Sequence, residues 1–222
     1  MPSREDWQRR LGPLYGGAVA LVHSSSWRWP TDVREDARAP GWVLAVGLPI
    51  GIVAYLAAAL LRGLHLPPTV AAIVGLGVLS LASAGIVERG LVDRLDRVQA
   101  RSPSTPAILV LVFTLLVRAA AIWSVAPAHW LGVFVATALV GRWAAVFPQA
   151  IGDPIIDDRA PRSLVAAPAP AWLAAAFGLA VASLVTLALG RAGLAAVALA
   201  TVAAFALGVD AQRRDAGLSA PV

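Results

Sequence analysis

The sequence predicts an all-α integral membrane protein, a polytopic bundle of about six transmembrane helices. Of its 222 residues, 59% are hydrophobic and 14% are charged, whereas soluble domains carry about 25% charged residues. The apolar residues gather in runs of about 18 to 20, long enough to cross a hydrocarbon core roughly 30 Å thick at 1.5 Å per residue. The chain has no cysteine, which excludes disulfides and thiolate metal sites.

The chain divides into a polar N-terminal segment, a transmembrane domain and a short tail. Residues 1–41 are expected to be cytoplasmic or interfacial, with Leu11–Val22 as an interfacial or partly inserted helix. Residues 42–209 form the transmembrane domain and residues 210–222 the tail. The last two spans join almost without a loop, so a tight hairpin that does not fully cross is the alternative. The six predicted spans are Trp42–Leu61, Val70–Val87, Ala107–Val125, Trp130–Phe147, Ala171–Gly190 and Ala192–Val209.

Arginine is distributed unequally between the two sides of the predicted bundle. With six crossings, residues 1–41, the loops 88–106 and 148–170 and the tail fall on one side. That side holds fourteen of the 18 arginines, and the other side holds two. Because cytoplasmic loops of membrane proteins carry the excess of Lys and Arg, both termini are expected in the cytoplasm. All 13 acidic residues fall on the same side, so polar chemistry is expected there.

Two arginines fall inside predicted spans. Arg118 lies about 17 Å into the third span, where a charge is costly unless it faces the bundle interior or water. No carboxylate lies within a predicted span, so backbone carbonyls, water, outward snorkelling or a bound anionic substrate would have to satisfy Arg118. Arg142 lies about five residues from the cytoplasmic end of its span and can snorkel to the surface.

The loop after the second span carries the densest charge in the chain. If that span continues as a helix, Asp93 and Asp96 share a face, and two such carboxylates can hold Mg²⁺ with room for substrate phosphates. Alternatively, Arg89 and Arg97 lie four residues either side of Asp93 and can pair with it along a solvated helix without any metal. A second acidic loop on the same side could add ligands or form only a turn; it carries Asp153, Asp157 and Asp158.

Four stretches, taken in order, are similar to motifs of one known family. Trp27-Arg-Trp-Pro30 keeps the arginine and proline of a turn near the start of the family's sequences. Val46-Gly-Leu-Pro-Ile-Gly51 is similar to the family's motif at the start of a helix. Gly141-Arg-Trp-Ala-Ala-Val146 resembles a later Gly-Arg-Trp stretch. Ala84–Arg97 aligns without a gap with the signature Gly-Gly-Leu-His-Leu-Asp-Gly-Leu-Ala-Asp-Thr-Ala-Asp-Gly, matching it at Gly85, Gly90, Leu91, Asp93 and Asp96. Together they resemble the cobalamin synthase family, the adenosylcobinamide-GDP ribazoletransferases of the bacterial inner membrane.

The resemblance implies a multi-pass inner-membrane transferase that acts at the last step of cobalamin assembly. It would join adenosylcobinamide-GDP to α-ribazole through attack by the ribazole 5-hydroxyl, with release of GMP. Asp93 and Asp96 would be the magnesium ligands and catalytic residues, and Glu88 a candidate substitute for a missing aspartate. Arg28 and Arg142 would orient phosphate groups.

The departures from the signature favour a second hypothesis. The signature histidine and first aspartate are replaced by Val87 and Arg89. Arg89, Arg94 and Arg97 would repel Mg²⁺ at close range, as expected of a catalytically degenerate member that acts as a membrane partner or scaffold. Both hypotheses leave a homo-oligomer open and involve the lipid bilayer but no nucleic acid. A transporter is the weaker third alternative, because no inverted repeat is visible.

Overall fold

The computed structural model describes residues 4–27, 39–85, 88, 105–151 and 170–215. Within these ranges the chain is helical and contains no strand, and four helical stretches are long and apolar enough to cross a membrane. The predicted fold class is therefore confirmed. The elements are α1 (Arg4–Leu11), η1 (Gly12–Leu14), α2 (Tyr15–Ser24), α3 (Ala39–Gly63), α4 (Pro68–Ala82), α6 (Thr105–Ser124), η2 (Pro127–His129), α7 (Trp130–Ile151) and α8 (Ala171–Asp215).

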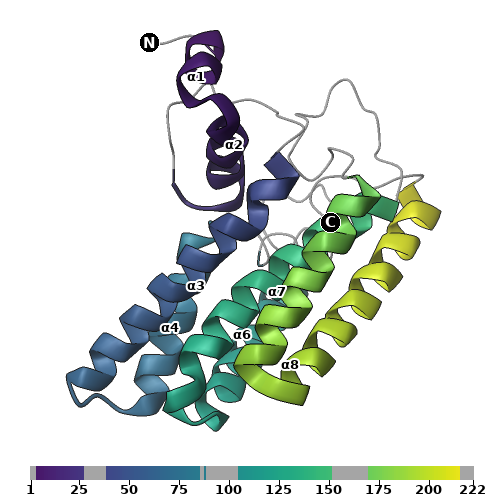
Figure 1. Ribbon diagram of the computed structural model, residues 1–222. Helices are drawn as coiled ribbons and strands as arrows, with labels where there is room; N and C mark the ends of the chain where they lie inside the picture. The colour runs from purple at the N-terminus through teal and green to yellow at the C-terminus, as the bar shows by residue number, and fades with distance from the viewer. Residues whose placement is uncertain (1–3, 28–38, 86–87, 89–104, 152–169, 216–222) are drawn as a thin grey trace.

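Helix α7 is the central helix of the bundle. It packs against α3 on one side and α8 on the other; α3 also contacts α2 and α4, and α6 packs chiefly on α4 (Figure 1). Phe134 and Leu139 of α7 are completely buried. On α8, Val181 and Val185 are also fully buried, in the same apolar cluster as Leu139. The core therefore follows α7 along its length.

Helix α8 is a hairpin of two limbs. Gly190 breaks the helix with φ 61° and ψ −142°, and the limbs run side by side with both ends of α8 at the same end of the bundle (Figure 1). A Cβ at Gly193 would collide with the carbonyl oxygen of Val185, which shows how closely the limbs approach. At 1.5 Å per residue, the limb before Gly190 is about 29 Å long and the limb after it about 37 Å. The two limbs correspond to the last two predicted spans, and each is long enough to cross.

Helix α4 is shorter than the predicted span Val70–Val87. Its 15 residues extend about 22 Å, less than a hydrocarbon core of roughly 30 Å. The prediction was wrong about where this helix ends, because hydropathy continues through Ile86 and Val87 while the backbone turns earlier. The described helix is therefore too short to cross the hydrocarbon core by itself.

A Schellman turn ends α4. The N–H of Gly85 donates to the carbonyl of Ser80 (2.8 Å), and the N–H of Ala84 donates to the carbonyl of Leu81 (3.0 Å). This is the usual hydrogen-bond pattern of a helix C-terminus with one left-handed residue. That residue is Ala84, with φ 56°, and Gly85 after it also has a positive φ, 61°. The turn satisfies backbone carbonyls that water could not reach inside a membrane.

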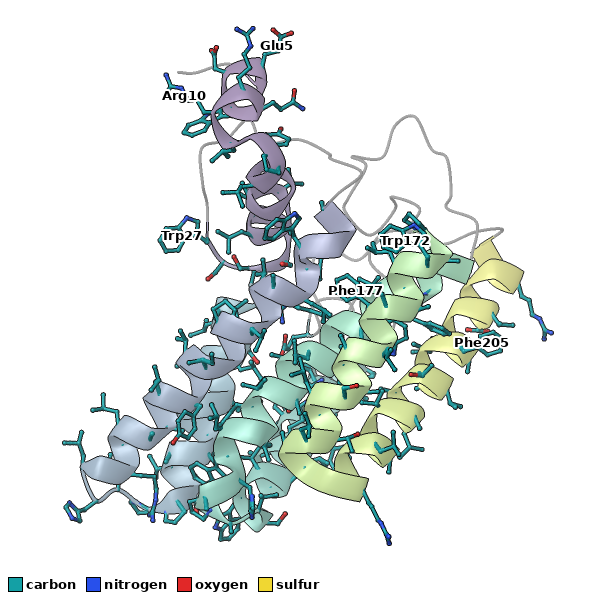
Figure 2. All side chains as sticks on the ribbon, in the orientation of Figure 1. Glu5, Arg10, Trp27, Trp172, Phe177 and Phe205 are labelled. Carbon is teal, nitrogen blue, oxygen red and sulfur yellow. The ribbon has the colours of Figure 1, made fainter. Side chains whose placement is uncertain are left out.

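The N-terminal segment is more deeply packed than an interfacial helix. Tyr15 and Val19 of α2 are buried at 1% and 0% exposure within the main apolar cluster, which includes residues of α3. Helix α1 extends away from the bundle, and Figure 2 shows Glu5 and Arg10 at its far tip. The bundle therefore includes α2, which lies within residues 1–41.

Helices α3 and α7 approach closely along two glycines one turn apart. A Cβ at Gly51 would lie 2.7 Å from the Cα of Val135, and a Cβ at Gly47 would lie 2.8 Å from the Cδ of Arg142. Small residues at i and i+4 allow transmembrane helices to pack with their backbones near one another. Gly47 and Gly51 also belong to one of the family-like stretches, so this stretch has a packing role.

The tryptophans near span ends do not all form an interfacial belt. Trp123 and Trp172 are 56% and 70% exposed, and Trp172 lies at the bundle end from which α1 projects (Figure 2). Trp130 and Trp143 are instead buried. The indole Nε1 of Trp143 donates to the Thr201 hydroxyl (2.9 Å) and so ties α7 to the second limb of α8.

Candidate functional site

The C-terminal ends of α2 and α4 meet beside α7. The N–H of Ser26, just after α2, donates to the carbonyl of Ala82, the last residue of α4 (2.9 Å). The Ser24 carbonyl accepts a hydrogen bond from Nη2 of Arg142 on α7 (2.9 Å). The residues that follow α2 and those that follow α4 therefore leave the bundle from one place.

Arg142 is 9% exposed and points into the bundle. Besides Ser24, it donates from Nη1 to the carbonyl of Ala138 (3.1 Å), and Nε is buried without a hydrogen-bond partner among the described residues. The missing side chain of Gly47 gives the arginine stem its space. Arg142 therefore joins α7 to the end of α2 and does not snorkel to the surface.

Glu88 and Arg118 form an ion pair inside the bundle. Nη1 of Arg118 lies 3.5 Å from Oε1 of Glu88, with side-chain exposures of 34% and 15%. The Ser80 hydroxyl donates to the same carboxylate oxygen (2.6 Å), and Oε2 is buried without a hydrogen-bond partner among the described residues. The carboxylate is therefore held from α4 and α6 together.

This ion pair corrects the expectation that no carboxylate would neutralise Arg118. An unpaired arginine at the centre of a transmembrane helix costs about 2.5–3.5 kcal/mol on insertion scales. Glu88 reaches Arg118 because α4 ends at Ala82. A straight helix continuing through Val87 would place Glu88 about 12 Å along the axis from Ser80.

The remaining predicted site residues lie outside the described part of the chain. They are Arg28, Asp93, Asp96, Asp153, Asp157 and Asp158. Within the described ranges, no group of three or more His, Cys, Asp or Glu side chains could hold a metal ion. Glu88 has a guanidinium 3.5 Å away, which disfavours a second cation on the same oxygen. A magnesium site would therefore have to draw its ligands from acidic residues outside the described ranges.

Sequence reasoning missed two residues of this polar region. Ser80 and Gly47 lie inside apolar runs, where serine and glycine are common and do not by themselves indicate a site. The signal for Gly47 was its four-residue spacing from Gly51 in a stretch that also resembles a family motif. Ser80 had no comparable signal, because its partner Glu88 lies beyond the end of the helix.

A sequence model of one family, described as cobalamin-5-phosphate synthase, matches residues 18–219. The chain belongs to this family. The match covers most of the chain and includes Glu88, Arg118 and Arg142, while α1 lies outside it. No curated protein and no solved structure is similar enough to match. The resemblance seen in the sequence is confirmed, and cobalamin-5-phosphate synthase membership places the chain in cobalamin biosynthesis.

Proposed function

We propose that this chain is a membrane transferase that joins adenosylcobinamide-GDP to an α-ribazole acceptor and releases GMP. The observation that carries the proposal is the family match over residues 18–219. The polar region around Glu88 and Arg142 supports it, because the signature segment begins at the turn that ends α4. The arginine distribution supports a cytoplasmic site in an inner-membrane protein with both termini inside.

The family description favours a phosphorylated acceptor. A cobalamin 5-phosphate as product requires α-ribazole that already carries its 5-phosphate. The 5-oxygen is then esterified, so another ribose hydroxyl attacks. Its oxygen bonds to the phosphorus attached to cobinamide, the bond from that phosphorus to the diphosphate bridging oxygen breaks, and GMP leaves with the electron pair. The hydroxyl proton passes to solvent.

In this proposal Asp93 and Asp96 hold Mg²⁺. The ion would supply positive charge that offsets the charge of the diphosphate leaving group. Arg28 orients a phosphate group. Arg142 fixes the end of α2 from which Arg28 follows, because its two terminal nitrogens donate to the carbonyls of Ala138 and Ser24.

The test is turnover in membranes that contain the protein. Adenosylcobinamide-GDP and Mg²⁺ are supplied with either α-ribazole or α-ribazole 5-phosphate, and GMP and the corrinoid product are measured together. We expect product with the wild type and loss of about 100-fold or more in Asp93→Asn and Asp96→Asn, since each removes a proposed metal ligand. Glu5→Gln is the matched control, because Glu5 is exposed and lies outside the family match.

Two results would contradict the proposal. Wild-type membranes that form no product with either acceptor would favour the non-catalytic scaffold. Full activity in both aspartate variants would remove the metal site while leaving the transferase assignment in place. Preference between the two acceptors decides which product the chain makes.

A further inference from the structure

The Glu88–Arg118 pair differs from an ordinary surface ion pair in its surroundings. Glu5 and Arg9 on α1 have the same N···O distance, 3.5 Å, but their side chains are 78% and 77% exposed. Exposed pairs of this kind contribute little, because water and salt screen them. The Glu88 carboxylate is 15% exposed and also accepts the Ser80 hydroxyl, so its position is fixed from two helices.

Helix α6 has few other means of holding a fixed position. Only 11% of its membrane-spanning window is buried, and it packs chiefly on α4. Its exposed residues are large and apolar, Phe113 and Leu116 among them, and within a bilayer such residues gain nothing by leaving lipid for protein. The ion pair links α6 to Glu88, which in turn accepts a hydrogen bond from Ser80 of α4.

Glu88 is also the first acidic residue of the signature segment. Five residues of extended chain span at most roughly 18 Å, so a fixed Glu88 limits where Asp93 can lie. If Glu88 were not held, the last fixed point before Asp93 would be the end of α4, and the range of positions open to Asp93 would be larger.

We propose that Arg118 is a positioning residue, which holds Glu88 against Ser80 and thereby fixes the start of the segment that carries Asp93 and Asp96. This inference rests on the proposed function for its effect on turnover. Glu88 then acts through its geometry and touches neither metal nor substrate. The competing role is metal ligation through Oε2, which has no hydrogen-bond partner among the described residues.

The two roles differ in what they require of the side chain. A positioning role needs an acceptor for Ser80 and Arg118, which the amide oxygen of Glu88→Gln still supplies. A ligand role needs the carboxylate, and loss of a metal-site group weakens metal binding about 10- to 100-fold. A positioning role also allows the two charges to be exchanged, whereas a ligand role does not.

The experiment compares variants of the full chain in membranes and in detergent. Glu88→Gln, Glu88→Ala, Arg118→Ala and the exchanged pair Glu88→Arg with Arg118→Glu are assayed for turnover and for the Mg²⁺ concentration at half-maximal rate. A double-mutant cycle on Glu88→Ala and Arg118→Ala, read as the unfolding midpoint, measures the pair without any substrate. The same cycle on Glu5→Ala and Arg9→Ala is the matched control.

The positioning role predicts four results. The cycle at Glu88 and Arg118 shows coupling, and the control cycle shows none. Glu88→Gln keeps turnover within about threefold and leaves the Mg²⁺ requirement unchanged. Each alanine variant loses turnover about 100-fold, the scale of a misplaced reacting group. The exchanged pair recovers most of that loss.

Opposite results would overturn it. A Glu88→Gln variant as inactive as Glu88→Ala, with a Mg²⁺ requirement raised about 10- to 100-fold, would make Glu88 a ligand. Absence of coupling in the cycle would remove the pair itself. Wild-type protein without turnover would contradict the proposed function. Coupling in the cycle would still establish that Arg118 and Glu88 interact.

Discussion

Arg142 and Arg118 both lie in membrane-spanning helices, yet the bundle satisfies them differently. Arg142 is on the central helix α7 and donates to the carbonyls of Ser24 and Ala138. Arg118 is on the peripheral helix α6 and pairs with Glu88. The helix that carries Arg142 is also the more buried of the two: 39% of the membrane-spanning window of α7 is buried, against 11% of that of α6.

The difference shows how packing decides what a buried cation needs. Beside α7, the end of α2 leaves a carbonyl unused by its own helix, and close packing at Gly47 holds the arginine against it. Beside α6 there are few neighbours, so a carboxylate must come from another part of the chain. An arginine in a tight interface joins backbone segments, and an arginine on an exposed helix fixes a charged side chain.

The largest effect expected from this comparison is that of Arg142→Ala. The variant removes two hydrogen bonds from a charged donor, each worth about 1.5–3 kcal/mol, and leaves the Ser24 carbonyl without this donor. We expect a loss of about 3 kcal/mol in the free energy of unfolding, measured by denaturant titration in detergent with tryptophan fluorescence.

Arg118→Ala is the matched variant on the other helix. Its side chain is one-third exposed, so water screens its charge and the pair contributes less than a fully buried one. We therefore expect a smaller loss than in Arg142→Ala, measured by the same denaturant titration. Equal losses in the two variants would contradict the distinction between the two sites.

Gly51→Ala should destabilise by about 2 kcal/mol, the usual range for overpacking being 1–3 kcal/mol. The new Cβ would lie 2.7 Å from the Cα of Val135, and backbone atoms cannot rotate away. Gly77→Ala is the control, because a Cβ there meets no atom within 4 Å. The unfolding midpoints of both variants are compared in one detergent.

Gly51→Ala also tests whether the α3–α7 interface and the Glu88–Arg118 pair are independent. Distant sites usually contribute independently, so the coupling between Glu88 and Arg118 should be unchanged in the Gly51→Ala background. Altered coupling would mean that the α3–α7 interface and the ion pair form one cooperative unit.

Hydropathy predicted the order and placement of the spans because each apolar run is about as long as a bilayer requires. It failed at α4, where the Schellman turn at Ala84 and Gly85 interrupts a run whose apolar character continues through Val87. Backbone direction at a turn depends on two or three dihedral angles, which a window average does not register.

The candidate site was predictable only in part. The family motifs identified the stretches around Gly47, Glu88 and Arg142, but not what these residues contact. The pairing of Arg118 with Glu88 joins positions 30 apart, and it follows from where α4 ends rather than from any local pattern. The roles of Asp93 and Asp96 stay predictions, because these residues lie outside the described chain.

The smallest expected effect is a gain in stability, in Ala84→Gly. Ala84 has φ 56°, a left-handed conformation that costs a residue with a Cβ about 1 kcal/mol relative to glycine, and the family signature has glycine at this position. We expect the free energy of unfolding to rise by about 1 kcal/mol. His65 is the matched position at the other end of the bundle, with φ 62° in the same kind of turn after α3.

His65→Gly should also stabilise, though less, because histidine tolerates the left-handed region better than alanine does. The pair of variants sharpens the comparison between the two ends of the bundle, since only Ala84 leads into Glu88. If the turn serves only to end the helix, Ala84→Gly leaves the Glu88–Arg118 coupling unchanged. A gain in stability accompanied by lost coupling would show that the strained alanine sets the direction in which the chain leaves α4 toward Arg118.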